Sequence, residues 1–563
     1  MPAFLLKKDR LFTNIIFVTS LAFIVGLYVW SLIGASWRWD DTQILLFLIQ
    51  NTPFEYLSRP AVWQQFSSAN LTPWLLLSFE IDFALFEFKP IYFYLHQILA
   101  LLVAAILLYA CLRLWVNRHS ALYGLILFLA GAPSMSVTQQ LMTRHYIEGA
   151  VFFLLSVFLF VKYLRLTKVW FLLGSSIAYV LAISAKEIYV PLVVLLLFVP
   201  DSNISNRIRA LAPFIVISSL YILWRGYMLD SYSGGYIEIS ELITLNFVTD
   251  IAANFSDFPV LLTGIAWPIA VFIYFLLMGW YFWRSQKSPL FMIIAVILVL
   301  APLVPLVSSP GINNPDRYLF LFWIAISFSF TCYSSWLSDQ FLVSKDFRSR
   351  NLVVCSMIIF ICCTAIQGVV TLLGVAKIGN EFDVQSKFAW SNNEEIAFVP
   401  SNSIIRSFWF FRGLRDLKKI YKNGEKSPIP VIDPIYLNND IEVLYTYNLE
   451  CKCMRNSSES LTERLQQHKN KLNRNAELEL EYSYNKGIFA WTAGPYLSGQ
   501  WDFLSDQLGG IAQASRIGQI RVSVEEGSEF YLRYSSPEGW LTYSIPLVIE
   551  DSEQPVHWTR NIE

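Results

Sequence analysis

The stretch SWRWDDTQ, residues 36–43, follows an apolar run that extends from Leu11 to Ile33. A run of this length is long enough to cross a bilayer as a helix, and it is too long for the core of a cleaved signal peptide. We therefore interpret it as a retained first membrane span. The turn after it contains two adjacent acids with aromatic and basic neighbours, namely Trp37, Arg38, Trp39, Asp40 and Asp41. Acidic side chains close to the hydrocarbon of a membrane are costly, so we expect these two to have a structural partner or a function.

The composition is that of a polytopic membrane protein. Of the 563 residues, 55% are hydrophobic and only 15% are charged. The formal net charge is −1, so bulk electrostatics gives no indication of a nucleic acid or an acidic partner. The charges that matter for function must be local ones.

Apolar windows of about 17 to 25 residues recur through the first two thirds of the chain. We predict about eleven membrane-spanning helices in an α-helical fold. The third window contains Gly131 and Pro133 and the sixth is short, features that are compatible with a broken or tilted helix in either. The predicted spans are 11–35, 92–112, 119–136, 146–164, 168–184, 188–200, 210–228, 260–282, 289–307, 318–337 and 352–376.

Basic residues gather in alternate loops, which by the positive-inside tendency places the N-terminus in the cytoplasm. An odd number of spans then places the C-terminal region on the opposite side of the membrane. We expect this membrane to be a bacterial inner membrane. The basic residues are Lys7, Lys8, Arg10, Arg113, Arg118, Lys162, Arg165, Lys168, Arg207, Arg209, Arg284, Lys287, Lys345, Arg348 and Arg350.

The chain is expected to form a transmembrane domain, residues 1–376, and an extracytoplasmic domain, residues 377–563. The first outer loop, residues 37–91, contains apolar segments with interspersed acids, a pattern typical of helices that lie in the interface. The C-terminal region is predicted to be mixed α/β, with strands at 519–524 and 529–534. We interpret the CKC sequence at Cys451 and Cys453 as too short a pattern for a metal site.

Isolated ionisable residues fall in the loops on the side opposite the basic clusters, and each has a structural alternative. Asp40 and Asp41 are equally well explained as a helix cap or a solvated loop. Lys186 is explained as a lysine at the interface paired with Glu187. Arg144 is explained as the partner of Glu148, four residues later on one helix. Arg317, beside Tyr318, is explained as a loop anchor.

Together these residues supply a carboxylate pair, three cations and aromatic walls on one side of the membrane. That combination suits a reaction in which a hydroxyl loses its proton to a carboxylate while a phosphate leaves, with its charge held by Arg and Lys. The aromatic walls would come from Trp37, Trp39, Tyr146 and Tyr318. We find no Gly-rich phosphate loop after a strand and no HExxH, so nucleotide-dependent and zinc-protease chemistry lack support.

The sequence resembles the C-type superfamily of membrane glycosyltransferases (GT-C), whose members use polyprenyl-phosphate sugars. The likeness to the protein O-mannosyltransferase branch is carried by motifs that occur in the family's order. Within the first loop, Thr72-Pro73-Trp74 replaces the family's Arg-Pro-Leu. The matching segments are WDDTQILLFLIQN (39–51), NLTPWLLLSFEIDFALFEFKP (70–90), MTRHYIE (142–148), SAKEIYVP (184–191) and NPDRYLFL (314–321).

The resemblance implies an inverting hexosyl- or pentosyltransferase that uses a polyprenyl-phosphate sugar. The acceptor would be a hydroxyl of a lipid-linked glycan, a glycolipid or a protein. Asp40 is implied as the general base, with Asp41 second. Arg317, Lys186 and Arg144 are implied for the donor phosphate, and the expected substrate pocket contains Trp37, Trp39, Glu148, Glu187 and Tyr318. Paired acids can hold a divalent metal, although a monophosphate leaving group does not require one.

A transporter or flippase of a polyprenyl-linked substrate is the alternative function. It accounts for a lipid-accessible cavity with phosphate-binding cations. It also predicts ionisable residues near the membrane midplane and helix symmetry between two halves, neither of which the sequence shows.

Overall fold

The computed structural model describes residues 3–67, 69–232, 264, 317–344, 347–394, 396–401, 408–422, 424–431, 433–436, 442–485, 488–505, 511–521, 527–550 and 554–560. The predicted span 289–307 lies outside the described residues, as does the span 260–282 apart from Gly264. Contacts divide the chain into two units. The first contains Met1–Gly34 and Asn70–Lys377, and the second contains Ala35–Ala69 and Ile378–Glu563.

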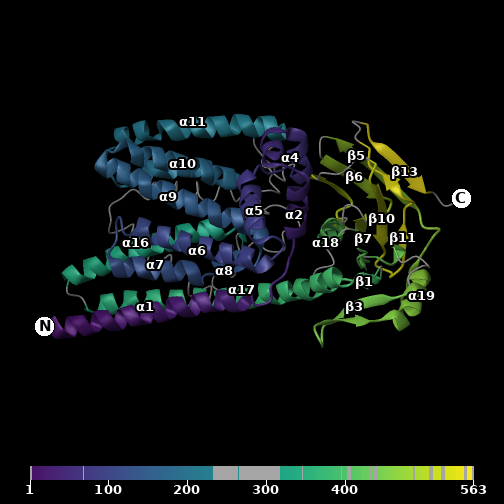
Figure 1. Ribbon diagram of the computed structural model, residues 1–563, viewed down its shortest axis with the longest axis horizontal. Coiled ribbons are helices and arrows are strands. Elements are labelled where there is room, and N and C mark those ends of the chain that lie inside the picture. The colour runs from purple at the N-terminus through teal and green to yellow at the C-terminus, as the bar shows by residue number, and fades with distance from the viewer. Residues whose placement is uncertain are drawn as a thin grey trace. The chain divides into compact units, whose positions relative to one another are not determined.

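The first unit is helical in its described part, with helices α6, α7, α9, α10 and α16 packed side by side (Figure 1). Helix α17 continues past Lys377 and contributes residues to both units. The elements are α1 (Ala3–Ser31), α5 (Pro73–Phe86), α6 (Pro90–Leu112), α7 (Arg118–Ala130), α8 (Ala132–Val137), η1 (Leu141–Thr143), α9 (Arg144–Leu166), α10 (Val169–Ala185), η2 (Glu187–Tyr189), η3 (Pro191–Phe198), α11 (Ile204–Leu229), α16 (Phe320–Ser344) and α17 (Phe347–Ser391).

The helices are those of an integral membrane protein. Within the described residues, four helices are long and apolar enough to cross a membrane. Further apolar helices are shorter, among them Val169–Ala185 and Phe320–Cys332. The count of eleven spans stays a prediction. The four long helices are Pro90–Leu112, Leu141–Leu166, Ile204–Leu229 and Ile358–Ser391.

The third predicted span is broken, as its Gly131 and Pro133 indicated. Helix α7 ends at Ala130, Gly131 is extended, and α8 begins at Ala132. The indole Nε1 of Trp323 donates a hydrogen bond of 2.9 Å to the carbonyl of Phe128, which the break releases from the helical ladder. A Cβ on Gly131 would lie 2.2 Å from the Trp323 ring, so only glycine permits this contact.

The sixth predicted span also departs from an α-helix, since residues 187–198 form the 3₁₀ segments η2 and η3. Close packing holds this segment against α9. The ring of Tyr189 lies over Gly149, where a Cβ would be 2.2 Å from the ring, and its hydroxyl donates to the Tyr146 carbonyl at 2.7 Å. The turn between α10 and η2 is thereby fixed beside the start of α9.

The second unit combines helices from the first loop with the C-terminal region. Helix α2 packs on α18, and the Thr42 hydroxyl donates to the Phe410 carbonyl at 2.9 Å. Residues 35–69 therefore belong with the C-terminal region by their contacts. The helical elements are α2 (Asp41–Gln50), α3 (Pro53–Ser58), α4 (Pro60–Phe66), α18 (Phe408–Tyr421), η9 (Pro434–Tyr436), η10 (Ser458–Ser460) and α19 (Leu461–Lys471).

The strands of the second unit form three sheets in its described part. One has the order β2-β1-β3-β4 with parallel pairing of β1 to β2 and β3, and the others are antiparallel, with orders β11-β10-β7-β8 and β13-β5-β6-β9. The strands are β1 (Ala397–Val399), β2 (Ile429–Pro430), β3 (Leu444–Asn448), β4 (Cys453–Asn456), β5 (Leu478–Asn485), β6 (Ile488–Gly494), β7 (Gln500–Leu504), β8 (Ile511–Ala514), β9 (Ile517–Arg521), β10 (Glu529–Ser535), β11 (Leu541–Tyr543), β12 (Leu547–Val548) and β13 (Val556–Arg560).

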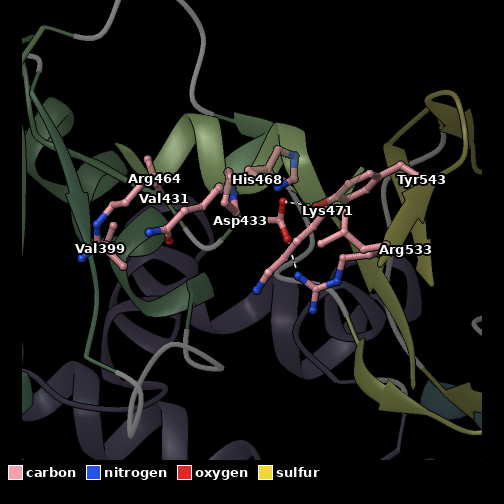
Figure 2. A pocket seen from close by; sticks show the side chains of 11 residues that line it. Val399, Val431, Asp433, Arg464, His468, Lys471, Arg533 and Tyr543 are labelled. Carbon is pink, nitrogen blue, oxygen red and sulfur yellow. Dashed lines mark hydrogen bonds and ion pairs between the residues drawn. The ribbon is translucent and has the colours of Figure 1, made fainter. Parts of the chain in front are cut away.

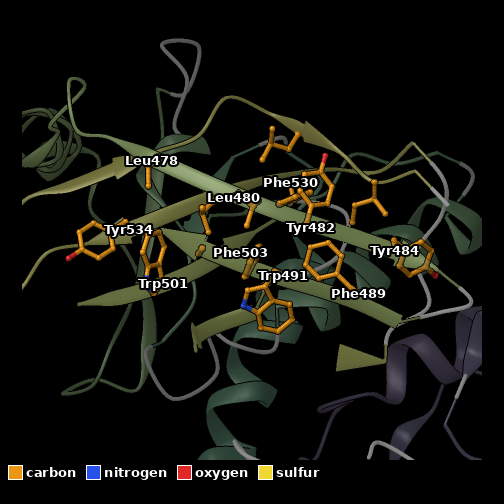
Figure 3. Packing of buried hydrophobic residues seen from close by; sticks show 14 residues of the cluster. Leu478, Leu480, Tyr482, Tyr484, Phe489, Trp491, Trp501, Phe503, Phe530 and Tyr534 are labelled. Atoms are coloured by element: carbon orange, nitrogen blue, oxygen red, sulfur yellow. The ribbon is translucent and has the colours of Figure 1, made fainter. Parts of the chain in front are cut away.

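An aromatic core lies between the two antiparallel sheets (Figure 3). Alternate residues of β5 point inward, which is the pattern of a strand with one buried face. The predicted strand at 529–534 is confirmed as β10, and the one at 519–524 coincides with the end of β9 as far as residue 521. The β3–β4 hairpin carries a disulfide between Cys451 and Cys453.

Candidate functional site

The residues predicted for the site fall in different units. The second unit contains Trp37, Trp39, Asp40 and Asp41. The first unit contains Arg144, Glu148, Lys186, Glu187, Arg317 and Tyr318.

The two acids occupy different positions at the start of α2. Asp40 is the N-cap residue and is partly exposed, whereas Asp41 is the first helical residue and is fully buried. The Asp41 carboxylate accepts a hydrogen bond of 2.9 Å from the backbone N–H of Arg38. This contact closes the turn that presents Asp40. Trp39 adopts the left-handed conformation, with φ of 46°, that the turn requires.

Arg38 anchors this turn to helix α17. Its Nε and Nη2 donate to the two carboxylate oxygens of Asp383 at 2.9 and 2.6 Å, and the backbone N–H of Ser36 donates to the same carboxylate at 2.7 Å. A Cβ on Gly379 would lie 2.6 Å from the guanidinium, so glycine makes room for it. The ring of Trp39 packs on Phe382 with centroids 5.2 Å apart. The Asp40–Asp41 turn is thus held by a buried, charged anchor.

Lys186 lies in the turn between α10 and η2. Its ammonium is 5.5 Å from the centroid of the Tyr146 ring and 3.5 Å from the Asn70 side-chain oxygen. Among the described residues, no carboxylate lies within 4.0 Å of it. Burial lowers the pKa of Lys186 to about 8, an effect that the nearby Arg317 reinforces and Glu187 opposes. Lys186 is therefore a buried cation whose charge the described protein neutralises poorly.

Arg317 belongs to the same cluster. Its guanidinium lies 4.9 Å from the centroid of the Tyr318 ring, and its nitrogens contact the Tyr318 hydroxyl at 3.0 Å and the Gln140 side-chain oxygen at 3.4 Å. The rings of Tyr318 and Tyr146 meet edge to face at 6.3 Å. We call Tyr146, Lys186, Arg317 and Tyr318 the cation cluster.

His145 lies beside the cation cluster and next to Arg144, which the sequence favoured for phosphate binding. Its ring, whose two nitrogens are buried, lies 4.5 Å from the Tyr146 ring and is close enough to interact electrostatically with both Lys186 and Arg317. Consecutive residues on a helix point about 100° apart, so Arg144 and His145 cannot face the same group. The segment MTRHYIE therefore offers both residues, and the sequence alone does not indicate which of them faces Lys186 and Arg317.

Arg144 and Glu148 contribute instead to a buried network with α5 and α6. The Arg144 guanidinium pairs with Asp82 at 2.6 Å and donates to the Phe93 carbonyl at 2.9 Å. Glu148 accepts from the Ser78 hydroxyl at 2.7 Å and the Trp74 indole at 2.8 Å. The expected pairing of Arg144 with Glu148 along one helix is thus replaced by the ion pair with Asp82. These contacts join α9 to the helix of the first loop.

Glu187 also has a partner other than Lys186, the adjacent residue with which the sequence analysis paired it. Its carboxylate pairs with Arg225 of α11 at 2.9 Å and accepts the backbone N–H of Leu71 at 2.7 Å. It holds the turn to α11 and to the segment before α5. The Lys186–Glu187 ion pair considered from the sequence is not formed at a distance of 4.0 Å or less.

A protein metal site needs several carboxylate, imidazole or thiolate ligands close together. The described part of the chain contains no group of three or more His, Cys, Asp or Glu side chains that could hold a metal ion. Asp40 and Asp41 point into different surroundings, one partly exposed and the other buried.

No family model matches the chain, and no curated protein matches it. Among solved structures, the chain is similar to two crystal structures of ArnT from Cupriavidus metallidurans. The TM-score is 0.41 for the structure bound to undecaprenyl phosphate and 0.38 for the apo state. Each has 12% sequence identity and covers 76% of this chain and 92% of the ArnT chain. At TM-scores this low, the likeness carries no weight in assigning a function.

Proposed function

We propose that the protein is an inverting GT-C glycosyltransferase of the membrane. It transfers one sugar from a polyprenyl-phosphate carrier to a hydroxyl on the extracytoplasmic side. The observation that carries the proposal is the cation cluster. Lys186 and Arg317 come from segments far apart in the chain, both were expected to bind phosphate, and they share one aromatic surface.

The electrostatics of the cluster favour an anionic ligand. Like charges close together destabilise each other, and burial of Lys186 adds the cost of desolvation. A phosphate bound between them offsets both effects. No carboxylate of the described residues lies within 4.0 Å of the Lys186 ammonium, and Glu187 acts on it only from farther away, so an anionic ligand in contact with it would be its nearest opposite charge. Arg offers paired N–H groups that match phosphate oxygens, and Lys adds a point charge.

The reaction requires a base as well as a phosphate site. The acceptor oxygen forms a bond to the anomeric carbon while the bond from that carbon to the phosphate oxygen breaks. The hydroxyl proton passes to the carboxylate of Asp40, and the bonding electrons leave with the polyprenyl phosphate, whose charge Lys186 and Arg317 stabilise. Attack opposite to the leaving group inverts the configuration. Asp40 is favoured over Asp41 because it is partly exposed, whereas Asp41 is buried and bonded to the Arg38 backbone.

Transfer from radiolabelled polyprenyl-phosphate sugars into membrane lipids and proteins tests the proposal. Asp40→Asn and Lys186→Gln should abolish or strongly reduce transfer at equal expression and with unchanged elution in size-exclusion chromatography. Lys168→Gln is the matched control, because Lys168 is exposed and flanks the other end of α10.

Two results would overturn the proposal. The first is transfer that persists in both Asp40→Asn and Lys186→Gln. The second is an intact protein that transfers no sugar from any donor while moving the carrier lipid between leaflets of reconstituted vesicles, which would favour the transporter.

A further inference from the structure

A pocket with a volume of about 260 Å³ lies within the second unit, between helix α19 and strands β10 and β11 (Figure 2). Its lining includes Asp433, Arg464, His468, Lys471, Arg533 and Tyr543. None of these residues was expected to take part in the transfer reaction. Pockets for drug-sized ligands span roughly 300–1,000 Å³, so the occupant of this one is smaller.

The inner wall of the pocket is a closed polar network. The buried Asp433 carboxylate accepts hydrogen bonds from the Tyr543 hydroxyl at 2.8 Å and from the Arg533 guanidinium (Figure 2). Arg533 also pairs with Asp502 at 2.8 Å. Burial raises the pKa of Tyr543, so its hydroxyl stays protonated and remains a donor. Because two carboxylates surround the Arg533 guanidinium, its positive charge is already neutralised and is not available to a ligand.

The positive charge available to a ligand comes from α19. Arg464, His468 and Lys471 are spaced four and three residues apart, so they lie on one face of the helix. Arg464 and Lys471 are exposed and line the pocket, and within the described chain neither has a carboxylate within 4.0 Å. Burial lowers the pKa of His468, so its ring is neutral at pH 7. The outer rim therefore carries two uncompensated positive charges.

The remaining surface suits a ring with an apolar face. The His468 and Tyr543 rings lie 5.7 Å apart, and Val431 and Leu541 complete the apolar part of the lining. A pocket with aromatic and aliphatic walls, a few fixed polar groups and a cationic rim discriminates by both shape and charge. A simple inorganic anion would leave the apolar walls unused, and a neutral sugar would leave both rim cations unused.

We propose that this pocket binds a sugar residue that carries an anionic substituent, a carboxylate or a phosphate. The ring lies against His468 and Tyr543, the hydroxyls meet the Asp433–Arg533 network, and Arg464 and Lys471 hold the anion. The site is a property of the second unit, and binding is measured without turnover. Its success or failure is therefore separate from that of the proposed transfer reaction.

Isothermal titration calorimetry on the full chain in detergent tests this site with D-glucuronate, glucose 6-phosphate, glucose and inorganic phosphate as probes. We expect the two anionic sugars to bind at least about tenfold more tightly than glucose or phosphate, since each charge-assisted contact contributes on that scale. Arg464→Gln combined with Lys471→Gln should weaken anionic-sugar binding by about tenfold or more. Lys469→Gln is the control, because Lys469 is exposed on the same helix and does not line the pocket.

Every other result overturns part or all of the proposal. Equal binding of glucose would remove the role of the anion, and equal binding of inorganic phosphate would remove the role of the sugar. The absence of measurable binding by both anionic sugars, or equal losses in the Lys469→Gln control, would overturn the site altogether. A preference between glucuronate and glucose 6-phosphate identifies the substituent.

Discussion

Arg38 and Asp383 form a buried, two-pronged ion pair across 345 positions of sequence, with nitrogen–oxygen distances of 2.9 and 2.6 Å. Their side chains are only 1% and 7% exposed. The pair joins the turn of Asp40 and Asp41 to helix α17. Because both charges are desolvated, each depends on the other.

Asp383→Ala should lower the free energy of unfolding of the second unit by about 3–5 kcal/mol, because it leaves the Arg38 guanidinium buried without its carboxylate. Chemical denaturation followed by tryptophan fluorescence measures the change. The control is Arg59→Ala, which breaks the exposed Glu55–Arg59 pair in the same unit and should have a much smaller effect on stability. Similar losses in the two variants would contradict the importance of the anchor.

Asp40 and Asp41 should respond differently to substitution. Asp40→Asn is expected to reduce kcat by about 10²–10⁴-fold, the usual contribution of a general base, and to leave stability unchanged. Asp41→Ala removes the acceptor for the Arg38 backbone N–H and should cost about 1 kcal/mol of stability. Paired measurements of kcat and of the thermal midpoint separate these effects. If Asp41→Asn proved as inactive as Asp40→Asn, the two acids would share the chemical role.

The transfer activity should fall in alkaline solution because the Lys186 ammonium loses its proton. Burial first, and then the charge of Arg317, lower the pKa of this ammonium to about 8. Below that pH the group is protonated and attracts the donor phosphate; above it the charge is lost. We therefore expect kcat/KM for the donor to decrease as the pH rises through about 8 in the free enzyme. Lys186→Arg should shift this decrease to higher pH, since a guanidinium stays protonated. An unchanged profile in Lys186→Arg would assign the decrease to another group.

Substitution of Arg144 should mainly affect stability, whereas substitution of Arg317 should mainly affect donor binding. Arg144→Gln leaves Asp82 buried without its ion-pair partner and is expected to lower the thermal midpoint markedly. Arg317→Gln removes a charge-assisted phosphate contact and should raise KM for the donor by roughly 10–100-fold with little loss of stability. Thermal unfolding and donor titration on both variants check this. A donor-specific defect in well-folded Arg144→Gln would support the role of Arg144 in binding the donor phosphate.

The sequence predicted those features that depend on local chemistry. The break at Gly131 and Pro133 follows from the conformational limits of these residues, and strand β10 follows from its alternating side chains. Lys186 and Arg317 could each be singled out because a cation beside an apolar segment is costly. Their sharing of one aromatic surface is a property of the fold.

Partners that lie far apart in sequence could not be predicted. Nothing near Arg38 points to Asp383, which lies in the last part of a long helix, and nothing near Arg144 requires Asp82 in preference to Glu148. The rotation of α9, which places His145 and not Arg144 beside Lys186 and Arg317, depends on packing with distant segments such as that of Tyr189 on Gly149. The pocket beneath α19 has no motif at all, because its lining comes from separate strands and a helix.

The second unit contains two segments of the chain that are synthesised at different times. Residues 35–69 emerge early, but α18 and the sheets follow only after Asn70–Lys377 has been synthesised. At about 5–20 residues per second, that interval lasts roughly 15–60 s. During it, α2 lacks α18, the helix on which it packs and to which the Thr42 hydroxyl is hydrogen-bonded. Biogenesis therefore includes a waiting stage in which the first loop must be kept from misfolding, and a C-terminal fragment expressed alone would start without the helices that complete it.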